Sequence, residues 1–188
     1  MRTFFDIVAP LYEIFHFGAE KSAGRLFALT EFKATDVVVD IGGGTGRIAK
    51  FFVGRVKSIT VIDPSEGMIE KCRKHKDITC VKGLAERLPL SDETVDKIII
   101  VDAFHHFRDQ ILAASEMKRV LIPGGRIAVE EFNPKILFGQ SIALFEKILH
   151  MGSRFHAPES LEKLFTTAGF EVELFSQSKS VYYLLAKK

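Results

Sequence analysis

The sequence predicts an α/β fold with a doubly wound, Rossmann-like sheet of seven strands, mostly parallel, that closes with an antiparallel C-terminal hairpin strand. Three observations support this prediction. Short runs rich in β-branched residues recur from residue 37 onward, and stretches of helical character separate them. The last two runs have no room for a crossover helix between them.

Five of the runs are continuously apolar, which is typical of parallel strands covered by helices on both faces. They lie at residues 37–41, 59–63, 78–81, 98–101 and 127–129. Residues 170–175 and 181–186 complete the set, and the polar stretch between them predicts an antiparallel hairpin.

Helices are expected between these strands, from their caps and apolar stripes. One follows Gly46, one begins near Ser65, and one runs over 110–121 until Pro123-Gly124-Gly125 stops it. A last helix ends near Ala168-Gly169, just before the hairpin.

A chain of 188 residues supplies one domain with a real core, so we expect a single domain over residues 1–188. Residues 1–30 precede the strand rhythm and predict an N-terminal helical cap, because apolar residues recur there at helical spacing. This stripe consists of Phe4, Val8, Leu11, Tyr12 and Phe15. Residues 133–157 form a variable insertion on the substrate side.

Charge indicates no macromolecular partner. Lys and Arg number 26 against 24 Asp and Glu, so we expect neither nucleic acid nor stable membrane insertion. No apolar run approaches the ~20 residues of a membrane span. Cys72 and Cys80 alone cannot form a disulfide framework or a zinc site, which suits a reducing, cytoplasmic setting. No oligomeric state is indicated.

The segment Asp40-Ile41-Gly42-Gly43-Gly44-Thr45-Gly46 falls where the first strand turns toward the next element, as in a ligand-binding turn. Its glycines also fit the dinucleotide fingerprint, so an NAD-dependent oxidoreductase is one alternative. Asp40 would repel a pyrophosphate and suits a ligand with a cationic group. Asp63 ends the second strand and suits a ribose diol, although Asp63-Pro64-Ser65 is also a turn and helix cap.

Four segments together resemble the class I S-adenosylmethionine-dependent methyltransferases. They are residues 40–46, Asp63-Pro64-Ser65-x-x-Met68, 83–90 and 119–125. Within that superfamily the chain is most similar to the menaquinone/ubiquinone-biosynthesis methyltransferases, through Phe5-Asp6-x-x-Ala9-Pro10-x-Tyr12 and residues 126–132. The resemblance covers nearly the whole chain and is weakest over 133–157.

The resemblance implies S-adenosylmethionine as cofactor and assigns its binding residues. Gly42, Gly44 and Gly46 would line the methionine end, with Asp40 at the ammonium group. Asp63 would bind the ribose, and Met68 would lie against the adenine. Leu84 and Ala85 would border the purine edge, while Pro64 and Glu86 belong to the same motifs. Asp102 would sit near the sulfonium and the acceptor. The family often has an acid or amide where Leu84 stands.

Methyl transfer is an in-line displacement that needs alignment and exclusion of water more than catalytic side chains. If the acceptor must lose a proton, His105 and His106 are the candidate bases, with His106 preferred for the catalytic role. Adjacent histidines point in different directions, so only one is expected to face the pocket. No metal site is expected, because no metal-binding spacing accompanies the histidines.

These observations predict an S-adenosylmethionine-dependent methyltransferase that acts on a small apolar or aromatic acceptor. Phenylalanines in the N-terminal segment and near the insertion would supply a dry pocket for it, although ordinary core packing explains them equally well. The alternatives are a non-catalytic S-adenosylmethionine-binding module and, with less support, the NAD-dependent oxidoreductase.

Overall fold

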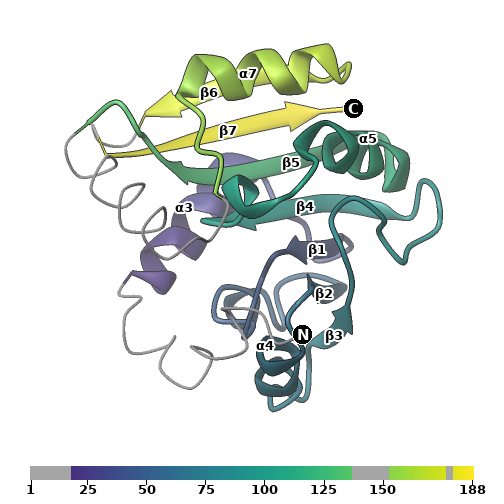
Figure 1. Cartoon of the computed structure of the whole chain (residues 1–188). Coiled ribbons are helices and arrows are strands. Elements are labelled where there is room, and N and C mark those ends of the chain that lie inside the picture. Colours follow the sequence, from purple (N-terminus) through teal and green to yellow (C-terminus); the bar gives the residue numbers. More distant parts are fainter. Residues whose placement is uncertain (1–17, 137–152, 177–179) are drawn as a thin grey trace.

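The computed structural model describes residues 18–136, 153–176 and 180–188, and these form one seven-stranded sheet (Figure 1). The strand order is β3-β2-β1-β4-β5-β7-β6. Both pairings of β7 are antiparallel, and the other pairs are parallel. The predicted fold class is confirmed. The strands are β1 (Val37–Ile41), β2 (Ser58–Asp63), β3 (Thr79–Lys82), β4 (Val95–Val101), β5 (Leu121–Phe132), β6 (Glu171–Ser176) and β7 (Val181–Lys187).

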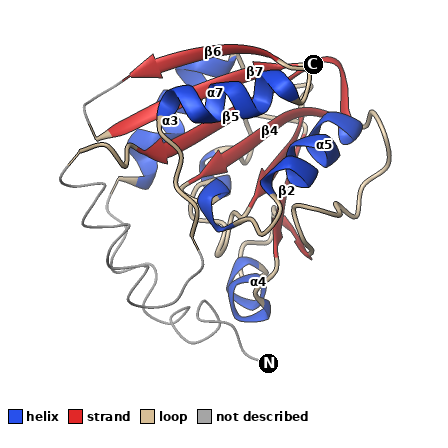
Figure 2. Cartoon of the chain, turned by 45° about the horizontal axis from the view of Figure 1, so that its top comes forward, coloured by secondary structure: helices blue, strands red, loops and turns tan. Residues whose placement is uncertain are grey.

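Helices cover both faces of the sheet (Figure 2). One face packs against α5 (Gln110–Val120) and α7 (Pro158–Thr167). The other packs against α3 (Ala19–Thr30) and α4 (Glu66–Cys72). The sheet is therefore the middle layer of three.

Strand β4 shows why its sequence is continuously apolar. Ile98 and Ile100 face the α5 and α7 side, whereas Ile99 and Val101 face the α3 side. The three isoleucines are fully buried. Both faces of the strand are therefore core, as the unbroken run predicts.

Two helices begin where the sequence predicts, whereas the helix predicted after Gly46 is much shorter than expected. Ser65 caps α4 by accepting the N–H of Met68, and Asp109 caps α5 by accepting that of Leu112. After Gly46 the expected helix is reduced to a 3-10 turn, Ala49–Phe51, which lies between Gly46 and Gly54, two glycines with positive φ. Pro123-Gly124-Gly125 falls inside β5 and does not separate it from α5.

Of the expected N-terminal cap, α3 is helical and lies against the sheet, while residues 1–17 are outside the described part of the chain. The predicted apolar stripe therefore stays a prediction. Most of the 133–157 insertion is likewise not described, but residues 153–157 are, and they reach the end of β4.

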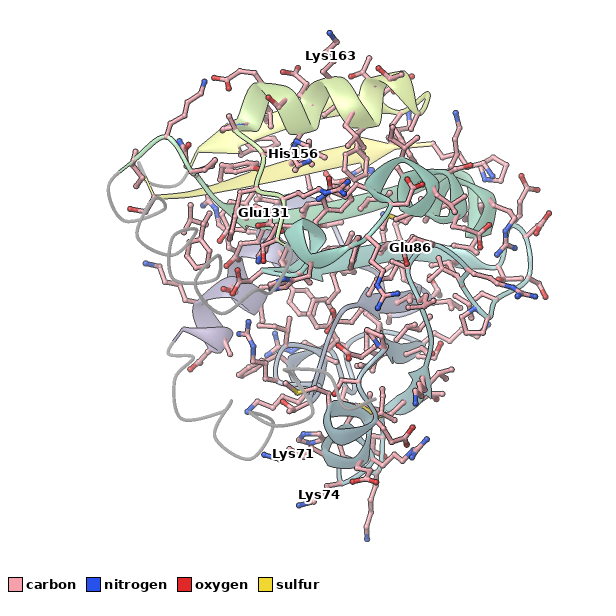
Figure 3. All side chains as sticks on the ribbon, viewed as in Figure 1. Lys71, Lys74, Glu86, Glu131, His156 and Lys163 are labelled. Carbon is pink, nitrogen blue, oxygen red and sulfur yellow. A yellow bond between two sulfur atoms is a disulfide. The ribbon has the colours of Figure 1, made fainter. Side chains whose placement is uncertain are left out.

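Phe165 anchors α7 to the sheet, and replacing it tests this packing. Its ring is fully buried, 5.3 Å from the ring of Phe104 and 5.7 Å from that of Phe170. We expect Phe165→Ala to lower the free energy of unfolding by about 3–5 kcal/mol, because a buried aromatic ring leaves a cavity. Urea denaturation measures it, with Lys163→Ala on the exposed side of α7 as control (Figure 3). A loss below about 1 kcal/mol would contradict this packing.

Candidate cofactor and acceptor site

The carboxyl ends of β1, β2, β4 and β5 meet at one edge of the sheet, at the left in Figure 1. Parallel pairing forces this arrangement, and ligands of open α/β sheets bind at such an edge. The loops that follow β1 and β4 touch, since a Cβ on Gly42 would lie 2.6 Å from the Cβ of Ala103. The predicted residues of both loops are thus brought together.

Asp40 lies beneath the glycine loop, at the end of β1. Its side chain is 1% exposed, and Oδ2 has no hydrogen-bond partner among the described residues. Burial raises the pKa of this carboxyl to about 7, the nearby charge of Arg47 opposes the rise, and that of Asp63 adds to it. A Cβ on Gly43 would lie 2.5 Å from the Asp40 carboxyl carbon, so only glycine fits above it.

Asp63 joins the two loops of the predicted cofactor site. Its Oδ2 accepts the N–H of Gly44 at 3.1 Å, and its Oδ1 accepts the N–H of Ser65 at 2.8 Å. Gly44 adopts φ 57°, a conformation that favours glycine. The residue is thus a turn-forming group, as one interpretation of the sequence held. A carboxylate oxygen can accept two hydrogen bonds, so a carboxylate at this place is of the type that binds ribose hydroxyls.

Arg47 is a site residue that the sequence analysis missed. It lines a hollow together with Asp40, the glycines 42–44, Ile48 and Val101. The sequence position of Arg47, directly after the last glycine of the loop, could have identified it, because a cation there faces the same hollow as Asp40. Arginine binds carboxylates in a bidentate manner, so Arg47 suits the carboxylate of an amino-acid ligand.

The residues predicted at the adenine end lie farther along the same edge. Met68 is buried, and its Sδ would lie 3.7 Å from a Cβ on Gly44. Leu84 is 46% exposed, while Ala85 beside it is buried. Pro64 is exposed. Glu86 has a structural contact, since its Oε1 accepts the N–H groups of Arg108 and Asp109 at the start of α5.

Cys72 and Cys80 form a disulfide between the end of α4 and β3. We did not expect this pairing, and a reducing compartment does not predict it. Two cysteines eight residues apart carry no spacing signature of a bond, and their approach depends on where α4 ends. The disulfide lies beside the glycine loop, because a Cβ on Gly46 would lie 3.4 Å from the Sγ of Cys72.

Asp102 follows β4 and turns the chain across the edge. It adopts φ 53°, an uncommon value for a residue other than glycine, and its N–H donates to the carbonyl of Glu130. Strained conformations of this kind cluster at functional sites. Its side chain is 19% exposed, so it borders the open side of the edge.

His105 is buried behind Asp102. Its Nδ1 lies 2.8 Å from Oε2 of Glu131, and its backbone N–H donates to Oε1 of the same carboxylate. Its Nε2 lies 4.0 Å from Oδ1 of Asp102. The ring of Phe155 stacks on the imidazole at 4.1 Å. Glu131, which the sequence analysis did not single out, is thus the partner of a histidine that it did.

His106, the predicted catalytic residue, is partly buried, and its Nδ1 lies 3.1 Å from the Oγ of Ser153. It faces the segment that precedes α7, so its catalytic role stays a prediction. His156 contacts Gln110, with Nε2 2.8 Å from Oε1, and burial lowers its pKa. Figure 3 shows His156 and Glu131 on the same side of the molecule, far from Lys71 and Lys74.

Comparisons with known proteins agree with this geometry. A family model described as a methyltransferase domain matches residues 39–129. The ubiquinone/menaquinone biosynthesis C-methyltransferase UbiE of Hahella chejuensis is 30% identical over 168 residues, which cover 79% of this chain and 68% of that protein. The chain belongs to the class I S-adenosylmethionine-dependent methyltransferases. Within them it lies near the UbiE type.

Two further proteins are similar to this chain, one by sequence and one by structure. The UbiE of Rubrivivax gelatinosus is 33% identical over 140 residues, which cover 71% of this chain but only 56% of that protein. The chain therefore spans little more than half the length of that relative. A solved SAM-dependent methyltransferase of Thermotoga maritima, described as a possible histamine N-methyltransferase, is 26% identical with a TM-score of 0.81, covering 98% of this chain and 97% of that one.

The residues of the edge fit the cofactor of this methyltransferase family. Asp40 offers a buried oxygen without a hydrogen-bond partner in the described chain, which suits an ammonium group. Asp63 offers carboxylate oxygens as acceptors for the ribose hydroxyls, and its Oδ2 already accepts the N–H of Gly44 in the glycine loop. None of the described helices has the length and apolar character to cross a membrane.

The buried carboxyl of Asp40 predicts a pH-dependent stability. Its pKa rises from 3.8 to about 7 on folding, so the native state keeps a proton that the unfolded chain releases. Stability should therefore fall as the pH rises from about 4 to about 7. The variant Asp40→Asn has no carboxyl to ionise, so it lacks this pH dependence. Between about pH 4 and pH 7, its free energy of unfolding relative to the wild type should increase by roughly 1.4 kcal/mol for each unit of pKa difference.

Urea midpoints at pH 5, 6, 7 and 8 measure this effect. Asp77→Asn, at an exposed side chain after α4, is the matched control and should follow the wild type. Parallel pH profiles for Asp40→Asn and the wild type would show that Asp40 ionises normally in the folded protein.

Proposed function

We propose that the protein transfers a methyl group from S-adenosylmethionine to a small apolar or aromatic acceptor, and that the acceptor is a reduced quinone ring or a molecule like it. The observation that carries this proposal is the buried Oδ2 of Asp40, which has no hydrogen-bond partner among the described residues and lies beside the Asp63 turn, within a chain of the methyltransferase family. The relatives named as ubiquinone/menaquinone biosynthesis C-methyltransferases support a ring acceptor.

The cofactor-binding part of this proposal follows the loops. Asp40 would pair with the ammonium group and Arg47 with the carboxylate of the methionine end. Asp63 would accept hydrogen bonds from the ribose, and Met68 and Ala85 would pack against the adenine. When bound, the cofactor supplies an electrophilic methyl group on a positively charged sulfur.

The acceptor part rests on aromatic side chains at the end of β4. The partly buried ring of Phe107 packs on the fully buried ring of Phe104, with 5.3 Å between their centroids, and the partly buried Phe155 covers His105. Apolar rings at this position exclude water and favour a flat apolar molecule. The phenylalanines 4, 5, 15, 17, 138 and 145 lie outside the described residues.

Both alternatives make different predictions. A nicotinamide oxidoreductase requires the loop to accept a pyrophosphate, whereas Asp40 and Asp63 surround it with buried carboxylates. A non-catalytic binding module would retain S-adenosylmethionine and methylate nothing. A screen of acceptors with radiolabelled S-adenosylmethionine, starting with 1,4-dihydroxynaphthalene under anaerobic conditions, separates that module from an enzyme.

Asp63→Ala tests the cofactor site. The variant loses acceptors for the ribose and for the N–H of Gly44, so the dissociation constant of S-adenosylhomocysteine should rise by at least about 30-fold. Isothermal titration calorimetry measures it. Glu171→Ala, at an exposed side chain on the opposite edge of the sheet, should bind as the wild type does. Wild-type protein that binds neither S-adenosylmethionine nor its demethylated product at millimolar concentration would rule the proposal out.

A further inference from the structure

Glu131 and His105 stand outside the cofactor-binding residues, and they form a buried carboxylate–imidazole pair at the edge. His105 is 1% exposed and Glu131 is 4% exposed. The carboxylate accepts from the imidazole and from the backbone N–H of the same residue, so it holds the ring in one orientation. A buried carboxylate that contacts a single histidine at two points is built to orient that histidine.

This contact also fixes which ring nitrogen is basic. Because the Glu131 carboxylate accepts, Nδ1 is the nitrogen that carries the proton. The lone pair then lies on Nε2, which faces Asp102 at 4.0 Å. Asp102 borders the open side of the edge, whereas His105 is enclosed beneath Phe155. The buried acceptor nitrogen therefore lies behind Asp102 but beyond direct hydrogen-bond distance, so a proton reaches it from Asp102 through a bridging water or after a small shift of the Asp102 side chain.

We propose that Glu131 and His105 are positioning residues that act through Asp102 to accept the proton that the methyl acceptor loses. This inference rests on the proposed function, because it requires an acceptor with a removable proton. The ordering from the surface inward is Asp102, then His105, then Glu131. The negative charge of Glu131 stabilises the imidazolium that forms.

The step balances for a hydroxylated ring. The O–H bond of the acceptor breaks, and its proton passes to Asp102 and on to Nε2 of His105. The electron pair, delocalised to a ring carbon, forms the bond to the methyl group, and the pair of the broken C–S bond stays on sulfur. The methylated carbon then loses its hydrogen to solvent as a proton, and the hydroxyl regains one from His105.

Glu131→Gln and His105→Asn test the pair. We expect kcat for 1,4-dihydroxynaphthalene to fall about 100-fold in each, the usual contribution of a positioned base. KM and the dissociation constant of S-adenosylhomocysteine should stay within threefold, which also shows that the variants fold. The matched control is Glu130→Gln, the neighbouring, partly buried carboxylate on β5, which contacts Ser22 on the opposite face. Its kcat should stay within threefold.

A pH profile distinguishes this role from a merely structural one. The groups that face His105 are Asp102, Glu131 and His106, and the charge of Glu131 also reaches His156 and Tyr182. In Glu131→Gln the acid limb of kcat should move to lower pH, because the imidazolium loses its counter-charge. The histidine nitrogen NMR signals supply a readout without turnover: the wild type should show the Nδ1–H form, and the titration should shift in Glu131→Gln.

The outcomes separate the two proposals. Wild-type protein that binds the cofactor but methylates no acceptor overturns the proposed function, and the NMR titration then decides the pair alone. An active wild type whose two variants keep kcat within threefold overturns the pair. Activity that a chelator abolishes and a divalent cation restores also overturns it, because the donor atoms of Asp102, His105 and Glu131 lie within 4.8 Å of one another and would then bind a metal.

Discussion

Parallel pairing of β4 with β1 on one side and β5 on the other determines where the functional residues of this protein lie. Asp40 pairs with Ile99, and Val101 pairs with Glu130, so the three strands leave the sheet at one edge. The loops approach so closely that a side chain on Gly42 would collide with Ala103. The residues proposed to bind the cofactor and the acceptor come from different loops, and they depend on this register to meet.

The edge also concentrates negative charge in a poorly solvated place. Asp40 and Asp63 are 1% and 7% exposed, and ionisation of one carboxyl makes ionisation of the other less favourable. Arg47 offsets part of this cost. A ligand with one positive group near Asp40 offsets more of it, whereas a pyrophosphate adds to it. The electrostatic cost of the free site is thus a source of selectivity for a cationic cofactor.

The parts of the fold that follow from local sequence were the parts that could be predicted. Strands covered on both faces are continuous apolar runs, the hairpin lacks room for a helix, and Asp40 and Asp63 stand at strand ends where ligands bind. The pairing of His105 with Glu131 spans 26 residues and depends on the β4–β5 register, which no local pattern contains. The Cys72–Cys80 bond and the short crossover after Gly46 likewise depend on tertiary packing.

The segment before α7 holds its place at the edge without relying on charge. Gln110 donates to the carbonyls of Phe104 and Arg154, which leaves its Oε1 as acceptor and fixes Nε2 of His156 as the donor. Burial lowers the pKa of His156, so this contact stays neutral near pH 7. Tyr182 donates to the His156 carbonyl, and Arg154 donates its N–H to the carbonyl of His105. The segment that covers His105 is therefore held by contacts that stay neutral near pH 7.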